Sequence, residues 1–491
     1  MQPRWKGLGK EMIDSTKSSV VRAGGADAHL VEEWHPLSSA QEGLWFLYQL
    51  RPESRPTYNQ AFCVRLRGAL DRETLARALN RLTARHGMLR ARFQEVDGRP
   101  RQSVAGSVEV PVSWTDVSGL SDDDIRDLAE DDYLRPFDLH AAPLIRASVF
   151  ERGPEDRVLL VACDHLVGDG WSWWRLLREL GELVGEQRGG TAPHAFEPAG
   201  AGDYLAHARH QRDWLSQADG EKQFTYWKEA LADATPGLDI ATDRQRGRVR
   251  GSRRGVQPVR ITGELVEAIR AFSRRHHATT FTTLLTGYAI LLHRLSGQEA
   301  VAVGAPMPAR GDGRWDEVVG NFMNPVALRA VFPPDLTVAG AVRQIRDTAL
   351  RGLANQDFPL RELAERLNPA RDADGNPFFS TMFVFQNPRE ENDIPRLMDP
   401  SPDAPTVTWA GMDATAFWCP MNGGAAFDLM LHLGEIGDHI TGALEYSSDL
   451  FDASTVERFV GYFRAVLSAM VADEGRLVGD VPLLDAVEEH R

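Results

Sequence analysis

The sequence predicts an α/β protein, an α+β sandwich built as two lobes. Its 491 residues exceed what one ordinary hydrophobic core holds. Strand-like segments of period two alternate with helix-like segments of period 3.6 in both halves. A stretch rich in Gly, Pro and Ala begins near residue 186 and separates the halves. We therefore expect a flexible N-terminal arm at 1–33, a first lobe at 34–190, an inter-lobe linker at 191–222, a second lobe at 223–480 and a tail at 481–491.

The first half opens with an alternating strand at 61–70, followed by a helix at 71–87. Asp71 stands where a helix cap is expected, since its carboxylate can accept a hydrogen bond from a free backbone N–H. One face of this helix is apolar and should face the core; it consists of Leu75, Ala78, Leu79 and Leu82.

Two further strands follow at 144–150 and 157–163. The first alternates between apolar and polar residues, which predicts one face open to solvent. The second, RVLLVAC, is apolar throughout and should be buried on both faces. A helix is expected to begin near Trp171.

The second half contains further helix-like and strand-like segments. Helices are predicted at 263–276, 279–296, 336–353 and 453–472, and strands at 299–304, 379–386, 427–433 and 440–447. The segment at 243–255 holds six arginines and fits neither period, which predicts a loop. A solvated charged loop is favoured there, and contact with an acidic partner is the alternative.

Composition excludes several classes of partner. A net charge of −15 argues against nucleic acid or an anionic membrane as the main partner, because both require a basic face. The three cysteines, Cys63, Cys163 and Cys419, form no CxxC pair, so neither a disulfide framework nor a metal site is expected. The longest apolar stretch, 281–295, is shorter than the roughly 20 residues of a membrane span. These observations favour a cytoplasmic protein.

The buried strand at 157–163 leads into an HxxxDG pattern formed by His165, Asp169 and Gly170. A histidine at a sheet edge can exchange a proton near neutral pH. Asp169 could bind the imidazole or pair with a distant cation, and the N–H of Gly170 could donate to an oxyanion. A core histidine beside an Asp-Gly turn explains the same residues without catalysis. The pattern alone leaves both interpretations open.

Other motifs offer weaker chemistry. His207, His210 and Asp213 have helical spacing that could hold a metal, although an exposed polar helix face is favoured. The sequence contains neither a GxSxG elbow nor a GxxxxGK[ST] loop. Serine hydrolases and P-loop nucleotide triphosphatases therefore lack their characteristic motifs here.

Seven ordered segments resemble the motifs of condensation domains of nonribosomal peptide synthetases. The resemblance extends over nearly all of 34–485. The segments are HPLSSAQEGLWFL (35–47), RHGMLRARF (85–93), CDHLVGDGWS (163–172), DYLAHARHQRDWL (203–215), VGNFMNPVALR (319–329), NQDFPLRELAERL (355–367) and RDADGNPFFSTMFVFQN (371–387).

This resemblance implies two chloramphenicol-acetyltransferase-like lobes forming a V with a tunnel between them. Acyl or peptidyl carrier proteins would deliver phosphopantetheine-bound substrates, and the chain itself would bind no cofactor. By the same resemblance His165 lies next to the attacking amine and Gly170 near the thioester oxygen, while Asp169 pairs with Arg310 across the lobes. Three further residues would belong to the substrate tunnel: Trp171, Ser172 and Asn324.

Asp164 departs from the family pattern, which has a first histidine there. The change creates the Asp164, Asp169 and Ser172 spacing of heterocyclisation domains. Condensation is favoured over cyclisation because His165 is retained and the opening motif differs from that of cyclisation domains. Successive side chains of a strand point to opposite faces. We therefore expect Asp164 to point into the fold, hydrogen-bonded, as structural support.

The implied activity is condensation of a carrier-bound acyl or aminoacyl thioester with an amine or hydroxyl acceptor, giving an amide or an ester. Three alternatives remain: a non-catalytic recruitment or gating domain, a heterocyclisation domain, and an acyltransferase that uses coenzyme A.

Overall fold

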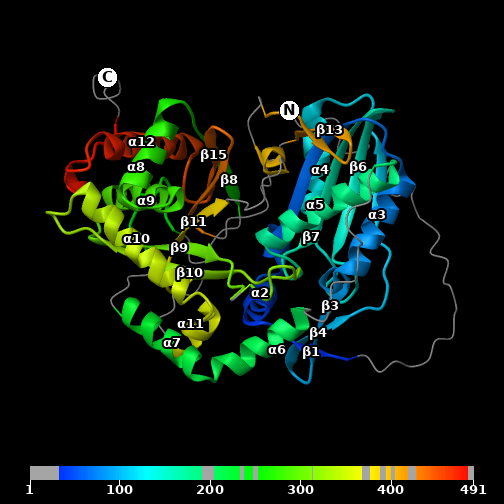
Figure 1. The fold of residues 1–491 in the computed structure, drawn as a ribbon, viewed down its shortest axis with the longest axis horizontal. Coiled ribbons are helices and arrows are strands. Elements are labelled where there is room, and N and C mark those ends of the chain that lie inside the picture. The colour runs from blue at the N-terminus through cyan, green and yellow to red at the C-terminus, as the bar shows by residue number, and fades with distance from the viewer. Residues whose placement is uncertain are drawn as a thin grey trace. The chain divides into compact units, whose positions relative to one another are not determined.

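The computed structural model describes residues 33–190, 204–232, 237–246, 253–311, 313–367, 376–386, 394–399, 404–417 and 427–484. Almost all of the predicted N-terminal arm, the first part of the predicted linker and most of the predicted tail lie outside these ranges. Within them, two six-stranded mixed sheets organise the chain from His35 onward (Figure 1). The predicted two-lobed α/β class is confirmed.

The N-terminal sheet has the strand order β12-β13-β2-β7-β6-β5, in which only β5 and β6 pair in parallel. Its strands are β12 (Val407–Trp409), β13 (Met412–Ala416), β2 (Asn59–Arg67), β7 (Asp156–Asp164), β6 (Ile145–Gly153) and β5 (Val112–Asp116). Alternate β7 side chains pack toward α3 (Arg72–Arg85) and α5 (Gly170–Gln187), and the others toward α4 (Asp122–Tyr133). Strand β7 is therefore buried on both faces, as its composition predicts.

The prediction that 144–150 has one face open to solvent is wrong. Residues 145–150 of β6 are all buried. The polar members of the alternation, Arg146 and Ser148, contact the end of α4: Ser148 donates to the Asp132 carboxylate at 2.7 Å, and Arg146 donates to the Asp132 carbonyl and, just beyond the helix, to the Arg135 carbonyl at 2.8 Å. The polar residues thus bond to a helix end, which needs partners for its last carbonyls.

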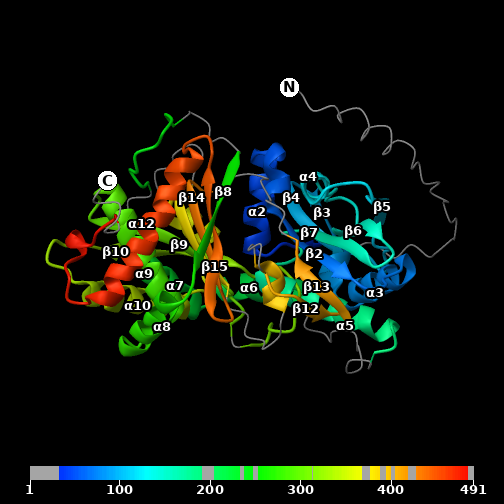
Figure 2. The same cartoon turned by 90° about the horizontal axis from the view of Figure 1, so that it is seen from above.

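The C-terminal sheet has the order β10-β9-β11-β14-β15-β8. Its strands are β10 (Asn324–Val331), β9 (Ala300–Met307), β11 (Thr381–Gln386), β14 (Leu429–Ile436), β15 (His439–Ser447) and β8 (Arg254–Ile261). Four helices, α8 (Glu264–Arg275), α9 (Thr280–Ser296), α10 (Val338–Ala354) and α12 (Ala453–Ala472), cover one face of this sheet (Figures 1 and 2). The four helices and strands β9, β11, β14 and β15 match predicted segments to within a few residues, whereas β8 and β10 were not predicted as strands.

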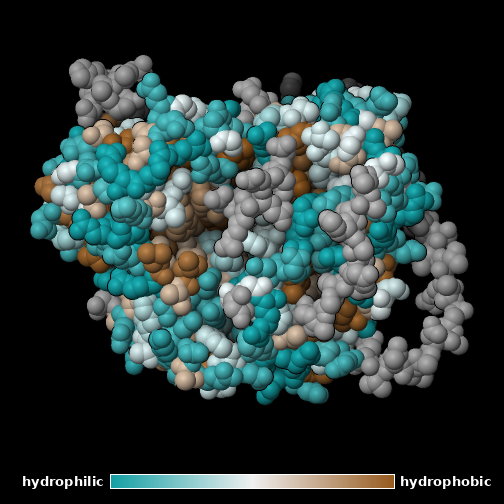
Figure 3. All heavy atoms as spheres, in the orientation of Figure 1, coloured by the Kyte–Doolittle hydropathy of each residue, from teal (hydrophilic) through white to brown (hydrophobic). Residues whose placement is uncertain are grey.

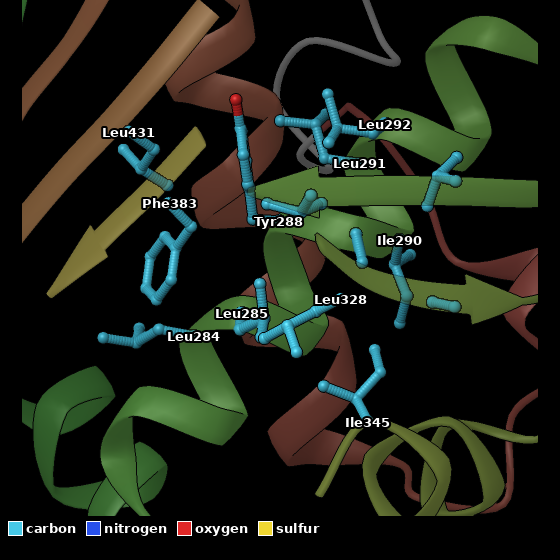
Figure 4. Packing of buried hydrophobic residues seen from close by; sticks show 14 of the residues in the cluster. Leu284, Leu285, Tyr288, Ile290, Leu291, Leu292, Leu328, Ile345, Phe383 and Leu431 are labelled. Carbon is cyan, nitrogen blue, oxygen red and sulfur yellow. The ribbon is translucent and has the colours of Figure 1, made fainter. Parts of the chain in front are cut away.

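Helix α9 is the centre of the second core. Every residue from Thr282 to Leu292 is buried. Its side chains meet Leu328 of β10, Ile345 of α10 and Phe383 of β11 (Figure 4). The apolar stretch at 281–295 is therefore a core helix, and no helix among the described ranges is long and apolar enough to cross a membrane. On the face seen in Figure 3, hydrophobic residues form only small groups among hydrophilic ones.

Shorter elements complete the described chain. A small antiparallel sheet has the order β1-β4-β3, with β1 at His35–Pro36, β4 at Arg99–Val104 and β3 at Ala91–Val96. The remaining α-helices are α2 (Ser39–Leu50), α6 (Tyr204–Leu215), α7 (Ala218–Ala230) and α11 (Leu360–Leu367). The 3₁₀ helices are η1 (Pro52–Tyr58), η2 (Gly87–Arg90), η3 (Ile394–Met398) and η4 (Val478–Asp480).

Strands β12 and β13 come from the second half of the chain but extend the N-terminal sheet. β13 pairs antiparallel with β2, Ala414 opposite Leu66. Trp409 of β12 donates its indole N–H to the Leu177 carbonyl of α5 at 3.2 Å. The two halves therefore share a sheet. The predicted division at 191–222 assigned β12 and β13 to the second lobe and did not anticipate this pairing.

The arginine-rich segment binds acidic groups of its own chain. Four of its six arginines form ion pairs: Arg244 with Asp452, Arg246 with Asp428, Arg253 with Asp449 and Arg254 with Glu445. Arg254 and Gly255 already belong to β8, so the predicted loop is shorter at this end. Residues 247–252 of the predicted loop lie outside the described ranges.

We expect Gly181→Ala to lower the free energy of unfolding by about 1 to 3 kcal/mol, because a Cβ there would lie 2.6 Å from Trp409 Nε1. Gly461→Ala in α12 is the matched control. No atom lies within 4 Å of a Cβ at that position, so alanine should stabilise the protein by about 0.5 to 1 kcal/mol. Urea denaturation of both variants measures the difference. Equal stabilisation by both would contradict the contact between α5 and β12.

Candidate functional site

The loop between β7 and α5 carries the HxxxDG residues. Strand β7 ends at Asp164, and the N–H of Val167 donates to the Asp164 carbonyl at 3.1 Å in a tight turn. Asp169 then caps α5, because its Oδ1 accepts the N–H of Ser172 at 2.8 Å. The sequence thus places His165 between the end of a buried strand and the beginning of a capped helix.

Asp169 pairs with Arg310 from the segment between β9 and β10. Arg310 Nη2 lies 3.0 Å from Asp169 Oδ1 and 3.2 Å from Oδ2, and the N–H of Phe322 donates to Oδ2 at 3.1 Å. Both residues are buried, with exposed fractions of 3% for Asp169 and 4% for Arg310. Of the two roles open to Asp169, the hydrogen bonds match the pairing with a distant cation.

Further bonds fix the orientation of the Arg310 guanidinium. Its Nη1 donates to the carbonyls of Trp315 at 2.7 Å and Val318 at 2.8 Å. The group also lies over the ring of Phe322, 4.1 Å from its centroid. With both Nη groups used in this way, the buried arginine balances the Asp169 charge.

Ser172 belongs to the same buried network. Its hydroxyl donates to the Gly320 carbonyl at 2.9 Å and accepts the N–H of Gly320 and Arg310 Nη2, both at 3.1 Å. The residue is 0% exposed. The hydroxyl therefore joins α5 to the second half of the chain, and its predicted contact with a substrate tunnel stays a prediction.

The other two predicted tunnel residues are placed differently. Trp171 is half-buried and donates its indole N–H to the Asp316 carbonyl at 3.2 Å. Asn324 donates to the carbonyls of Gln356 and Phe358 at 2.8 and 2.7 Å and accepts the N–H of Leu360 at 2.9 Å. The Asn324 amide thus holds the 356–360 segment, and none of these contacts joins it to Asp169 or Arg310.

His165 is half-buried, and its surroundings favour the neutral imidazole. Loss of hydration lowers its pKa, and this effect outweighs the backbone of His165, the Asp169 charge and the backbone of Gly168, which raise it. Nδ1 is buried without a hydrogen-bond partner among the described residues. At neutral pH the ring can therefore accept a proton.

Gly170 begins α5, five residues after His165 in the chain. No heavy atom lies within 4 Å of the position that a Cβ would take there. As the first residue of the helix, its N–H has no carbonyl partner four residues earlier in the same helix. The glycine therefore leaves open space at the beginning of α5, at the positive end of the helix dipole.

Asp164 is buried and hydrogen-bonded, as predicted. Only 2% of its surface is exposed. Its Oδ1 accepts the N–H of Leu166 at 2.8 Å and the hydroxyl of Tyr48 at 3.1 Å. Burial raises the pKa of its carboxyl to about 6, against the opposing effect of these two bonds.

The prediction that the 207–213 residues form an exposed polar face is wrong for His207. This side chain is 6% exposed and lies against Phe322 and Trp315, with ring centroids 4.4 and 5.4 Å away. Burial lowers its pKa to about 3, so it is a neutral member of an aromatic cluster. Across the described ranges, no group of three or more His, Cys, Asp or Glu side chains is arranged to hold a metal.

The family model for the condensation domain matches residues 31–491. The chain belongs to the condensation-domain family. The match includes both six-stranded sheets and the HxxxDG loop between β7 and α5.

Curated relatives of this condensation domain are large synthetases. It is 35% identical over 456 residues to malpibaldin synthetase of Mortierella alpina, covering 92% of this chain and 8% of that protein. It is 30% identical over 458 residues to bacitracin synthase 3 of Bacillus licheniformis, covering 93% and 7%. The chain thus spans less than a tenth of the length of these relatives.

Solved structures share the fold of this condensation domain. The four-domain nonribosomal peptide synthetase AB3403 matches with a TM-score of 0.84 at 23% identity, covering 94% of this chain and 35% of that one. The X-domain from teicoplanin biosynthesis matches with a TM-score of 0.77 at 22% identity, covering 94% and 100%. The first condensation domain of the calcium-dependent antibiotic synthetase matches with a TM-score of 0.75 at 21% identity, covering 92% and 99%.

Sequence reasoning missed the residues through which α2 and α6 support the site. Gln41 Nε2 donates to the Leu166 carbonyl at 3.0 Å, directly after His165. The hydroxyls of Ser38 and Tyr204 bond to each other at 2.7 Å, and Tyr204 also donates to the Asn321 carbonyl. Ser38 and Gln41 have capping-box spacing, which predicts a helix start but not these distant partners.

We expect Arg310→Ala to lower the free energy of unfolding by about 3 to 5 kcal/mol, because it leaves the Asp169 charge buried without a cation. The matched control is Arg314→Ala, an exposed arginine of the same segment, which should change it by less than about 0.5 kcal/mol. Chemical denaturation at pH 7 gives both values. Similar small losses would show that the ion pair is not essential to the folded state.

Proposed function

We propose that this chain is a catalytically active condensation domain of nonribosomal peptide biosynthesis. It joins a carrier-bound acyl or aminoacyl thioester to an amine or hydroxyl acceptor and forms an amide or ester bond. The observation that carries the proposal is the neutral imidazole of His165, held between a buried strand and a helix that the Asp169–Arg310 pair fixes. A side chain that can take up a proton at neutral pH is what attack by an amine requires.

In the proposed reaction, the lone pair of the acceptor nitrogen attacks the thioester carbonyl carbon. His165 takes the proton that the nitrogen loses as the C–N bond forms. The C–S bond then breaks, and the thiolate of the phosphopantetheine arm receives the proton as it leaves. For a hydroxyl acceptor the same sequence gives a C–O bond.

Gly170 supports this assignment through space and charge. In this proposal, the open space at its Cβ position receives the reacting carbonyl. Its N–H, at the beginning of α5, is suited to donate to the oxygen that gains negative charge in the tetrahedral intermediate. Asp169 and Arg310 act as positioning residues in this proposal, since their polar atoms bond to each other and to the backbone.

Acyl or peptidyl carrier proteins are the proposed partners, and phosphopantetheine on the carrier belongs to the substrate. The relatives are synthetases much longer than this chain, which supports carriers from the same assembly. A binding role is the alternative from another class, because one structure of similar fold is a complex of the X-domain with OxyB. Heterocyclisation and the use of coenzyme A as donor are further alternatives that product analysis separates.

A single-turnover assay with loaded carriers tests the catalytic assignment. We expect His165→Ala to form product about 10² to 10⁴ times more slowly than the wild type, because general base catalysis typically contributes that factor. His140→Ala, an exposed histidine of the same half, is the control and should keep the wild-type rate. Mass spectrometry identifies amide, ester or cyclised products, and an acyl-CoA arm tests a carrier-free donor. Equal product from wild type and His165→Ala would remove the catalytic role.

We expect Gly170→Val to fold normally, because a Cβ at this position has no neighbouring heavy atom within 4 Å. Its branched side chain should occupy the open space at the beginning of α5, where we propose that the reacting carbonyl lies, and reduce turnover at least tenfold. Thermal unfolding and the single-turnover rate, measured on the same sample, separate the two effects. Wild-type turnover in this variant would show that no substrate group enters that space.

A further inference from the structure

Asp164 is a buried ionisable residue that the proposed reaction does not use. Its Oδ1 accepts two hydrogen bonds, from the N–H of Leu166 and from the hydroxyl of Tyr48. Leu166 directly follows His165 in the chain. The carboxylate is therefore bound to the backbone of the loop that carries the imidazole.

Leu166 is held on both sides of its backbone. Asp164 accepts its N–H at 2.8 Å, and Gln41 donates to its carbonyl at 3.0 Å. Gln41 and Tyr48 both belong to α2, and both are almost fully buried, with exposed fractions of 0% and 1%. Helix α2 thus binds the loop directly through Gln41 and indirectly through the hydrogen bond between Tyr48 and Asp164.

The surroundings of Asp164 keep the carboxylate in place. Its backbone N–H donates to the Leu144 carbonyl, so the peptide group before the loop is fixed as well. Arg55, whose guanidinium lies 5.7 Å from the Tyr48 ring centroid, and Arg146 of β6 favour the ionised form. Cys163 is also buried beside it, and burial raises the pKa of its thiol, so that group stays neutral.

Burial of the Asp164 carboxylate costs free energy, because the charged form loses its hydration. Its folded pKa of about 6 lies above the usual value of 3.8, so folding favours the protonated form. The stability that this group contributes is complete below pH 4 and is lost as the pH rises through 6. An ionised acceptor nevertheless makes hydrogen bonds roughly twice as strong as a neutral one, which explains how it can hold a loop.

We infer that Asp164 and Tyr48 are positioning residues that fix the His165 loop against α2 through the N–H of Leu166. The inference rests on the proposed function, since it concerns the orientation of the same imidazole. Asp164 is not a catalytic residue in this account, because its carboxylate faces the protein interior.

Three variants test the inference by single-turnover kinetics. Asp164→Ala removes the acceptor and should reduce kcat at least tenfold with little change in KM, since small misplacements of a reacting group are costly. Asp164→Asn retains an acceptor oxygen and should stay within about threefold of wild type. Tyr48→Phe should lose about fivefold, and combining it with Asp164→Asn should give less than the product of the two losses.

Tyr133→Phe is the matched control. Tyr133 is also buried, and its hydroxyl donates to the Asn59 carbonyl at 2.9 Å, where Asn59 pairs with Asp164 across β2 and β7. The variant loses a comparable hydrogen bond between α4 and β2 but no contact with the loop. It should lose stability while keeping kcat. Equal kcat losses in Tyr48→Phe and Tyr133→Phe would overturn the inference.

Two measurements need no substrate and so separate this inference from the proposed function. In histidine-labelled protein, the NMR signal of His165 should shift in Asp164→Ala and stay near its wild-type position in Asp164→Asn and Tyr133→Phe. In pH-dependent denaturation, the free energy of unfolding of Asp164→Asn relative to that of wild type should increase as the pH rises from 4 to 6, because only the wild type has the carboxyl that ionises. An unshifted His165 signal in Asp164→Ala overturns the inference whether or not the wild type turns over substrate, whereas an inactive wild type with the expected shift overturns only the proposed function.

Discussion

The buried ion pair of Asp169 and Arg310 is the interaction on which the arrangement of the site depends. Asp169 caps α5 and therefore fixes the direction of the helix that follows the HxxxDG loop. Arg310 donates hydrogen bonds to two backbone carbonyls of its own segment, so the ion pair links α5 to the connection between β9 and β10. Because two charges withdrawn from water are stable only when fully paired, this link tolerates little displacement of either group.

Local sequence patterns predicted the elements that depend on local physics. The cap at Asp71, the doubly buried β7 and the four long helices of the second half all follow from periodicity and capping chemistry. The error at β6 has the same origin. Alternation shows that polar and apolar residues face opposite ways, but it does not show whether a polar face meets water or, as at Ser148, the end of a helix.

The site was only partly predictable, because its residues come from distant segments. His165, Asp169 and Gly170 lie within six positions, so one motif identifies them, whereas Arg310 was paired with Asp169 through a family resemblance alone. The contacts of Tyr48 with the Asp164 carboxylate and of Gln41 with the Leu166 carbonyl have no local sequence signal, because each joins residues more than a hundred positions apart. The burial of His207 was likewise unpredictable, because its aromatic neighbours Trp315 and Phe322 follow over a hundred positions later.

Strands β12 and β13 restrict where the chain can be cut into fragments, because they belong to the second half but pair within the N-terminal sheet. Without β13, strand β2 would present unpaired N–H and C=O groups along an exposed edge, which is a template for aggregation. A fragment that ends before residue 407 would therefore lack part of its own first sheet. The two halves thus share one sheet, and engineering that exchanges one half for that of a relative must keep β13 and the edge of β2 matched.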